Sequence, residues 1–567
     1  MICLKSRKWS GTPRNLRVAQ RVRGTARKFR SAPLAALCKT YSGTDFLPLC
    51  SSTASTTRLL VSMLNFRYNS VMYEWRFRIT PGIIPQPLLE TSYFAGWGRI
   101  PRLTKTFVRE NELLIHTNSC NSGTVHVPMV HAPLGVVMES TESLLSRHAP
   151  YLLVRELARG ALGRCYRRLF DWQMVGFIQP EELEERIAEI AQRFSCAVVQ
   201  DPFLPEIEQE FVEILDDIAL LIVEENREFA EQSLSWRTRN DERLPIVLGI
   251  GTNARHFESL QNFDAYAKLL QDSFHVVQHT PTWRELEPQP GQFDWEHLEK
   301  HLTTPFRFGF HIVFGPLISF NVDTIPEWLL PKLPEEGYFE TRATRFVNTV
   351  AERYGHLAHS WILANRFVDQ SLSDMPPERS LGLIRMLAQQ LRSRGIESPL
   401  IVGISQPWGE YALQQTPSWE QVQIAETLMG CRDIDTFLLE MDIGCGKHLT
   451  LPRDPMCIGN MIDQWSFLGK KIYISLSIPS AGAPILTTSE LAPEILWSEE
   501  KQRIWTETLL LTLLGKRMVR GIFWSCLQDP VTPSDVSAGF DYGLIDAQQA
   551  LKSAFKHFSA IRRNLLQ

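Results

Sequence analysis

The sequence predicts an α/β protein whose carboxyl-terminal part is a (β/α)8 (TIM) barrel, preceded by a small β-module and a helical segment. Two patterns lead to this prediction. Short apolar runs alternate with stretches of helical spacing throughout residues 244–567. Within residues 63–140, by contrast, Tyr73–Ile79 alternates apolar and polar side chains at period two and further short apolar runs follow. The length of 567 residues accommodates a barrel of about 250 residues together with smaller parts.

Composition excludes several classes of protein. The chain has 59 Lys+Arg and 63 Asp+Glu, a net charge of −4, which gives no reason to expect nucleic acid or an anionic membrane as partner. Aliphatic runs such as residues 218–223 are far shorter than the ~20 residues that span a bilayer. The ten cysteines form no CxxC pair, so they predict neither a zinc ribbon nor a disulfide framework. No motif indicates a metal ion or another cofactor.

The first 62 residues differ from the rest of the chain. They contain twelve Lys/Arg and one acid, Asp45, and they lack the apolar core of a secretory signal. An organelle transit peptide, a basic disordered arm and a start placed too far upstream are all compatible with this composition. We favour the last, because Met63 begins an ordinary patterned segment, and we leave the compartment as cytoplasmic or unknown.

Residues 63–140 are expected to form the β-module. Tyr73–Ile79 alternates apolar and polar residues, as a half-buried strand does, and residues 113–116 and 124–127 form further short apolar runs. Residues 141–243 are expected to be helical, with apolar residues three or four apart in three segments: Pro150–Phe170, Pro180–Phe194 and Pro205–Trp236.

Eight short apolar runs follow and are expected to be the barrel strands. They are Ile246–Gly251, His275–His279, Gly309–Gly315, Ser360–Asn365, Leu400–Ser405, Thr436–Asp442, Lys471–Ile478 and Val519–Trp524. In a barrel of this kind the chemistry lies at the carboxyl ends of the strands, so candidate functional residues are sought there.

One of these strand ends carries a recognisable motif. Residues 283–295 read W-R-E-L-E-P-Q-P-G-Q-F-D-W, which resembles the second-strand motif of glycoside hydrolase family 10, the endo-1,4-β-xylanases. Further matches occur in the family's order: H-I-V-F at 311–314 with P-E-W-L at 326–329, W-I-L-A-N-R at 361–366, G-I-F-W at 521–524, and G-L-I-D at 543–546. The resemblance covers roughly residues 246–567. It implies a carbohydrate-active barrel acting on or binding β-1,4-linked, xylan-type polysaccharide.

The resemblance also implies a retaining mechanism, which needs one carboxylate as nucleophile and another as acid/base. The family's acid/base glutamate follows an asparagine on the fourth strand, where this chain has Asn365 and then Arg366. An arginine stays protonated and cannot shuttle the proton. The nucleophile position falls on Ser475 if the seventh strand is aligned on Pro479, and on Glu440 if L-E-M-D is matched instead. Both alignments remain open.

Other candidates lie near the strand ends. The tryptophans Trp283, Trp328, Trp361, Trp408 and Trp524 could stack on sugar rings or simply fill the barrel mouth. The substrate-binding residues that we expect are Trp283, Asn365, Arg366, Trp408, Glu410 and Trp524. Arg366 could instead neutralise Glu410 or Glu440 in a buried ion pair.

Three functions are compatible with these residues. The barrel could be an enzyme that uses a rearranged pair of carboxylates from a set of four: Glu410, Glu440, Asp442 and Asp529. It could be a pseudoenzyme that binds an oligo- or polysaccharide without cleaving it. It could also be a scaffold for the amino-terminal module, since a fold does not determine a function. The missing acid favours degenerate catalysis.

Overall fold

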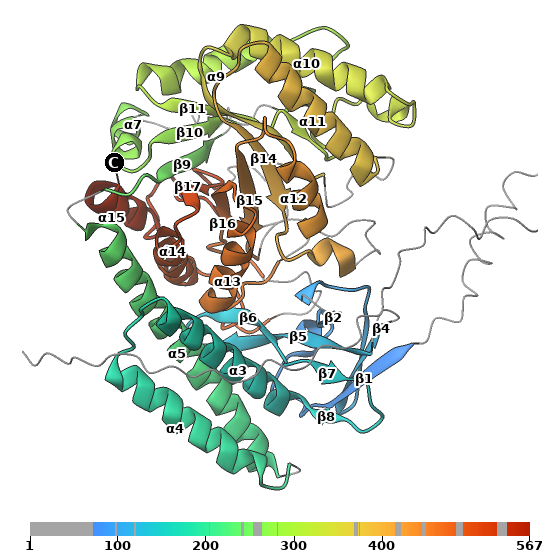
Figure 1. Ribbon diagram of the computed structural model, residues 1–567, viewed down its shortest axis with the longest axis vertical. Coiled ribbons are helices and arrows are strands. Elements are labelled where there is room, and N and C mark those ends of the chain that lie inside the picture. The colour runs from blue at the N-terminus through green and yellow to red at the C-terminus, as the bar shows by residue number, and fades with distance from the viewer. Residues whose placement is uncertain are drawn as a thin grey trace, which may run out of the picture. The chain divides into compact units, whose positions relative to one another are not determined.

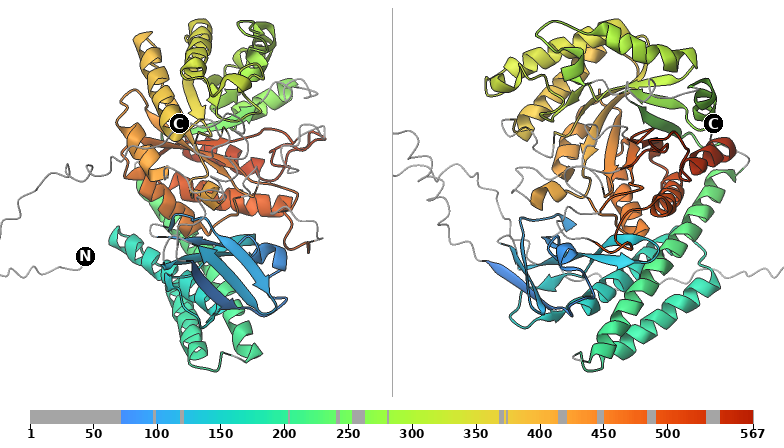
Figure 2. Two further views of the ribbon diagram at one scale, coloured as in Figure 1. Left: turned by 90° about the vertical axis from the view of Figure 1, so that its right-hand side faces the viewer. Right: turned by 180° about the vertical axis from the view of Figure 1, so that it is seen from behind.

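The computed structural model describes residues 72–566, and everything described belongs to one compact unit, residues 70–567. Short internal stretches are not described: 97–98, 118–120, 203, 240–242, 253–262, 280–281, 368–371, 373–374, 414–420, 445–449, 484–490 and 530–540. The predictions made for residues 1–62 lie outside the described residues. Figures 1 and 2 show the barrel together with the β-module and three long helices.

The barrel is closed and consists of eight parallel strands, as predicted. Its first strand, β9, pairs with both the second, β10, and the eighth, β17. In chain order the strands are β9 (Val247–Thr252), β10 (Val276–His279), β11 (His311–Phe314), β13 (Ala358–Asn365), β14 (Leu400–Ser405), β15 (Thr436–Asp442), β16 (Lys471–Ser477) and β17 (Val519–Trp524). The two-residue strand β12 (Ile318–Ser319) adds to the carboxyl end of β13. All eight predicted strands are therefore confirmed: three have the predicted bounds, and the ends of the other five differ by at most two residues.

Helices surround the strands (Figure 1). They are α7 (Phe263–Gln271), α8 (Trp283–Leu286), α9 (Trp295–Arg307), α10 (Tyr338–Tyr354), α11 (Pro377–Ser393), α12 (Gln421–Met429), α13 (Pro455–Ser466), α14 (Glu499–Leu514) and α15 (Phe555–Leu565), with 3-10 turns η3 (Leu330–Lys332) and η4 (Glu410–Leu413). Local sequence determines several of their starts. The Asp454 carboxylate accepts the Cys457 amide at 2.7 Å to begin α13, and the Ser498 hydroxyl accepts the Lys501 amide at 3.2 Å to begin α14.

Large side chains fill the lower part of the barrel interior. Six buried residues from alternate strand positions form one cluster: Val276, Val313, Ile362, Ile401, Leu438 and Phe523. The Phe523 ring occupies the space beside Gly249, where an added Cβ would lie 2.2 Å from a ring carbon. This packing makes a floor, so the space above it at the carboxyl ends is the part of the barrel that remains open.

The β-module contains two small sheets that share one hydrophobic core with the helical segment that follows them. One sheet has the order β3-β4-β1-β8 and the other has the order β2-β5-β6, with β7 paired to β5. The strands are β1 (Tyr73–Arg78), β2 (Tyr93–Ala95), β3 (Lys105–Arg109), β4 (Glu112–Thr117), β5 (Ser122–His131), β6 (Gly135–Ser140), β7 (Leu144–Leu145) and β8 (Tyr151–Leu152), and a short helix α2 (Gln86–Leu89) follows β1. As the alternation in β1 predicts, Trp75 and Phe77 are fully buried.

Three long helices link the β-module to the barrel: α3 (Leu153–Met174), α4 (Glu181–Val198) and α5 (Pro205–Arg237). The longest, α5, packs against α3 and α4 on one side and against α13 and α14 of the barrel on the other (Figure 1). The buried amide of Asn226 on α5 donates a hydrogen bond of 2.8 Å to Thr512 on α14. Among the described residues, no helix is both long and apolar enough to cross a bilayer.

Candidate functional site

A cavity of about 270 Å³ opens at the carboxyl ends of the barrel strands. Its lining combines hydroxyl, amide and charged groups with one indole: Gln278, Thr282, Trp283, Pro316, Ser319, Thr324, Asn365, Arg366, Glu440, Asp442, Ser475 and Ser525. Most of these residues are the last inward-facing positions of their strands or lie just beyond them. This location is where barrels of this architecture place their ligands. We call it the barrel pocket.

Glu440 is held in the pocket by an asparagine from two strands away. The Asn365 side-chain amide, at the end of β13, donates a hydrogen bond of 2.6 Å to Glu440 on β15. Gly403 on the intervening strand β14 makes this contact possible. A Cβ at position 403 would lie 2.7 Å from the Asn365 Cβ and 3.3 Å from the Glu440 Oε1. Because Gly403 has no side chain, residues of the two strands on either side of β14 can contact each other across it.

Arg366 forms an ion pair with Asp442 inside the same pocket. The guanidinium Nη2 lies 3.2 Å from the Asp442 Oδ2, and the two side chains are 30% and 31% exposed. The Ser477 hydroxyl donates to the other carboxylate oxygen at 2.7 Å and lies 2.7 Å from the Ser525 hydroxyl. The carboxylate of Asp442 is thus bonded on both oxygens, while the pair as a whole stays accessible from the cavity.

The backbone of Arg366 is unusual. Its φ of +56° lies in the left-handed region, which side chains other than glycine rarely adopt. Residues held in this way often occur at functional sites, where the surrounding structure imposes the conformation. Here the conformation places a large cation directly after Asn365, at the fourth-strand position where the family resemblance implies a glutamate.

Both candidates for the nucleophile position face the pocket. Ser475 on β16 is the direct neighbour of Glu440 on β15 in the parallel register, and both line the cavity. The strand count places Glu440 on the sixth strand and Ser475 on the seventh. Among the described lining residues, Glu440 and Asp442 are the carboxylates, and they are two residues apart on one strand.

Three of the expected substrate-binding residues lie outside the pocket. Glu410 forms a buried ion pair of 2.8 Å with Arg453, so it is Arg453 and not Arg366 that neutralises it. The same guanidinium lies 4.4 Å above the Trp408 ring and donates to the Tyr93 hydroxyl of the β-module at 2.5 Å. Trp408 and Glu410 therefore belong to the contact between the barrel and the β-module.

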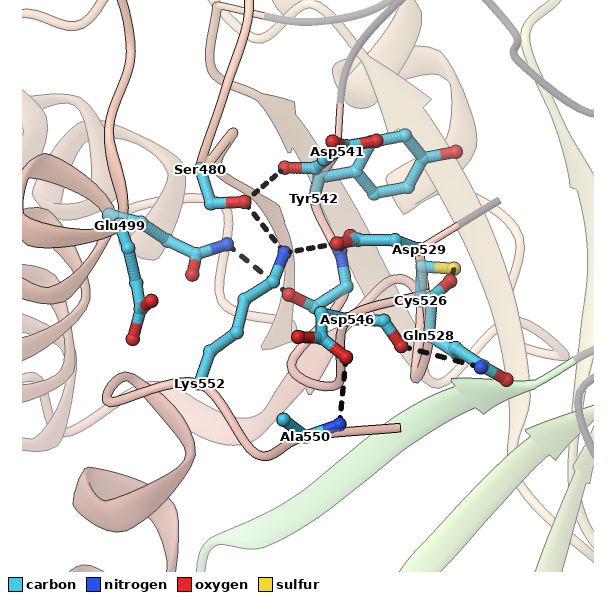
Figure 3. A network of polar contacts seen from close by, with 12 residues as sticks. Ser480, Glu499, Cys526, Gln528, Asp529, Asp541, Tyr542, Asp546, Ala550 and Lys552 are labelled. Atoms are coloured by element: carbon cyan, nitrogen blue, oxygen red, sulfur yellow. Dashed lines mark hydrogen bonds and ion pairs between the residues drawn. The ribbon is translucent and has the colours of Figure 1, made fainter. Parts of the chain in front are cut away.

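The third, Trp524, is fully buried, and its indole N–H donates to the Tyr542 carbonyl at 2.9 Å. Asp529, a candidate for a rearranged carboxylate pair, lies in a separate closed network near the end of β17 (Figure 3). It forms an ion pair of 2.5 Å with Lys552 and accepts the Gly543 amide at 2.7 Å. Burial raises the pKa of Asp529, and the Lys552 ammonium opposes that rise. Asp529 is not among the residues that line the pocket.

The tryptophans mostly serve as core. Trp361 is fully buried, and the Trp328 indole donates to the Glu287 carbonyl at 3.0 Å. Trp283 is the one that lines the pocket, although it is only 2% exposed, stacks on Phe346 and donates to the Glu287 carboxylate at 2.7 Å. Its indole nitrogen is therefore already engaged within the chain.

Several lining residues were not anticipated from the sequence. Gln278 and Ser525 are polar residues at or just beyond strand ends, without a motif to distinguish them. The alternation of inward-facing and outward-facing residues along a barrel strand could have predicted them, since every second residue faces inward. The same alternation places Asp442 on the inward face with Glu440. Among the described residues, no cluster of three or more His, Cys, Asp or Glu side chains is arranged to hold a metal ion.

Comparison with known proteins gives two kinds of match. A family model described as Glyco_hydro_42, beta-galactosidase, matches residues 264–362. Solved structures similar to this chain include xylanase 10B from Thermotoga maritima, with 15% identity, a TM-score of 0.44, and coverage of 59% of this chain and 97% of that one. No curated protein matches the chain.

A glycosylated glycoside hydrolase family 10 endo-β-1,4-xylanase from Gloeophyllum trabeum is also similar, with 14% identity, a TM-score of 0.42, and coverage of 57% and 98%. A family 10 xylanase from Thermobacillus composti has 17% identity, a TM-score of 0.41, and coverage of 58% and 99%. Both of these solved structures are described as family 10 xylanases.

Proposed function

We propose that the barrel pocket binds β-1,4-linked, xylan-type saccharides and that retaining hydrolysis of the glycoside-hydrolase type has been lost. The observation that carries this proposal is the Arg366–Asp442 ion pair, which occupies the pocket directly after Asn365. The guanidinium cannot give up a proton to a leaving group at any working pH.

The positions of the remaining carboxylates support the same conclusion. Retaining hydrolysis needs two carboxyl groups that flank the scissile bond from opposite sides, about 5–5.5 Å apart. Glu440 and Asp442 come from one strand, two residues apart, so their backbone positions are separated by roughly 7 Å along the same wall. Two groups on one wall can accept hydrogen bonds from neighbouring sugar hydroxyls. They are poorly placed to act on opposite faces of one ring.

Binding is the first property to test. Titration of xylotriose into the protein should release heat. It should also change the tryptophan fluorescence of the protein, because Trp283 lines the cavity. Glu440→Gln should weaken this binding at least tenfold, because hydrogen bonds to a charged group contribute about 1.5–3 kcal/mol. Glu327→Gln is the matched control, since the Glu327 side chain is 82% exposed outside the pocket. A lactose titration serves as a second arm, because the matching family model is described as beta-galactosidase.

Residual hydrolysis through Glu440 is the second candidate, and the hydrogen bond from Asn365 favours it. An aryl β-xyloside with a good leaving group needs little acid assistance. If Glu440 is a nucleophile, this substrate should give a burst and a trapped glycosyl-enzyme that Glu440→Gln abolishes. If Ser475 occupies the nucleophile position, no burst should occur.

Restored carboxylates distinguish the two alignments further. Under the Glu440 alignment, Arg366→Glu alone supplies the missing acid and should produce measurable hydrolysis of aryl β-xylosides. Under the Ser475 alignment, activity should require Arg366→Glu together with Ser475→Glu. A protein that binds none of these saccharides and stays inactive in both variants would instead act as a scaffold.

A further inference from the structure

The ion pair in the barrel pocket has a geometry that a ligand can improve. Arg366 contacts Asp442 through one guanidinium nitrogen, Nη2, at 3.2 Å. Charge-assisted N–H···O bonds are usually about 2.7–2.9 Å long, and an arginine binds a carboxylate best through two parallel N–H groups. Ion pairs as accessible to water as this one contribute little to stability. Asp442 is therefore a partner of Arg366 that another carboxylate can replace.

Asp442 keeps a hydrogen bond when Arg366 turns away from it. The Ser477 hydroxyl donates to Asp442 Oδ1 at 2.7 Å, and this buried serine is the direct neighbour of Asp442 in the register of β15 and β16. The Asp442 side chain is also partly exposed and lines the cavity, where water or a ligand hydroxyl can bond its other oxygen. The exchange of partners therefore leaves no buried carboxylate unsatisfied.

The charges of the pocket are unevenly distributed around Arg366. Both carboxylates among the described lining residues, Glu440 and Asp442, belong to β15, two strands from β13. On the other side of β13, Ser319 of β12 pairs with Asn365. The described lining residues on that side are uncharged: Gln278, Thr282, Trp283, Pro316, Ser319 and Thr324. A negatively charged ligand group can lie there without contacting either carboxylate.

We propose that the barrel pocket prefers saccharides that carry a carboxylate, as uronic acids do, and that this carboxylate replaces Asp442 as the partner of Arg366. The inference rests on the proposed saccharide binding and specifies which saccharides the pocket selects. The ligand carboxylate accepts two parallel N–H bonds from the guanidinium, while Asp442 stays bonded to Ser477. Neutral sugars bind through the hydroxyl and amide groups of the lining, and they bind more weakly.

Calorimetric titration of the full chain with two glycosides tests the proposal. Methyl β-D-glucuronide and methyl β-D-glucoside differ only at C6, which is a carboxylate in the first and a hydroxymethyl group in the second. The glucuronide should bind about tenfold or more tightly, because hydrogen bonds between two charged groups are the strong ones. High salt should reduce this difference. The methyl ester of the glucuronide, which has no charge, should bind like the glucoside.

Substitutions identify the group that is responsible for the preference. Arg366→Met should abolish it, and Arg366→Lys should retain only part of it, because an ammonium cannot offer two parallel N–H groups in a plane. Asp442→Asn should strengthen glucuronide binding, since it removes the competing carboxylate, and a purely structural role of Arg366 would not produce this effect. Arg394→Met is the matched control. Arg394 is 41% exposed and pairs with Glu352 outside the pocket, so its substitution should leave the preference unchanged.

The outcomes separate this inference from the proposed function. Xylotriose binding without a preference for the glucuronide would overturn the inference and leave the proposed function standing, and so would a preference that Arg366→Met leaves intact. Binding of the glucuronide but not of xylotriose would support the preference and contradict xylan-type ligands. If xylotriose and both glycosides fail to bind, both proposals are wrong.

Discussion

Two charged pairs at the carboxyl ends of the barrel strands have opposite environments. Arg366–Asp442 lines an open cavity, with both side chains about 30% exposed. Lys552–Asp529 is enclosed, with side chains 7% and 5% exposed, and Lys552 also donates to Ser480 at 2.6 Å (Figure 3). An ionic pair at a strand end is therefore not by itself a functional site. A pair that retains access to a cavity can exchange partners with a ligand, and an enclosed pair serves the fold.

Replacing the cation of each pair by methionine should give the largest difference in stability between the two pairs. Lys552→Met leaves a buried carboxylate without its cation, which should reduce the free energy of unfolding by about 3–5 kcal/mol. Arg366→Met should reduce it by no more than about 1 kcal/mol, because water can solvate the remaining Asp442. Urea denaturation of both variants measures the difference. Equal losses would show that the two environments do not differ as described.

A glycine substitution tests whether the pocket depends on close packing between strands. Gly403→Ala pushes on Asn365 and Glu440, so it should destabilise the protein by about 1–3 kcal/mol and weaken xylotriose binding. Gly382 in α11 is the control, since an added Cβ meets nothing within 4 Å there. Gly382→Ala should stabilise by about 0.4–1 kcal/mol. Unchanged binding in Gly403→Ala would mean that the Asn365–Glu440 contact is irrelevant to the ligand.

Glu225 on α5 is a third buried or partly buried carboxylate to set beside Asp442 and Asp529. It is fully buried, and the Gln179 side-chain amide donates a hydrogen bond to it. Burial raises the pKa of Glu225 to about 7. The folded protein then binds a proton that the unfolded chain has already lost, so stability should fall as pH rises from about 4.5 to 7. We expect the free energy of unfolding to fall by about 1–3 kcal/mol across this window. A lower thermal midpoint at pH 8 than at pH 5 would show this fall.

Glu225→Gln should flatten this pH dependence, because an amide keeps the neutral form at every pH. Glu189→Gln, at an exposed position of α4, is the control and should leave it intact. If the slope persists in Glu225→Gln, another group is responsible for it.

The smallest expected effect concerns the backbone of Arg366. Because its φ is +56°, glycine should be tolerated there better than alanine by about 1 kcal/mol. Arg366→Gly and Arg366→Ala both lose the ion pair, so their difference in urea midpoint reports the left-handed conformation, less the greater freedom of glycine in the unfolded chain. An alanine variant at least as stable as the glycine variant would indicate that the conformation relaxes.

The barrel was predictable because its determinants are local. Each strand is a short apolar run, and the period of two placed Glu440 and Asp442 on the same inward face. The alternation of strands and helices, together with the resemblance to family 10, predicted Asn365, Arg366 and Ser475 at the carboxyl end of the barrel, and all three line the pocket.

Contacts between distant segments were not predictable. Glu410 lies in the 3-10 turn that follows β14, where the sequence alone suggests access to the barrel mouth, yet Arg453 neutralises it. Arg453 is in turn bonded to Tyr93, 360 residues away in the sequence. Trp524 ends a strand with its indole bonded to a backbone carbonyl of a later loop. No periodicity reports which strand end is covered by a neighbouring module or loop, and that covering decides whether a residue reaches a ligand.

The most direct test of the proposed function follows xylotriose and an aryl β-xyloside with the wild-type protein and with Glu440→Gln in parallel. We predict that the wild type binds xylotriose, that Glu440→Gln weakens binding at least tenfold, and that neither protein releases product above the uncatalysed rate. Sustained turnover by the wild type that substitutions at Glu440 and Asp442 leave unchanged would contradict both the loss of hydrolysis and the location of the site.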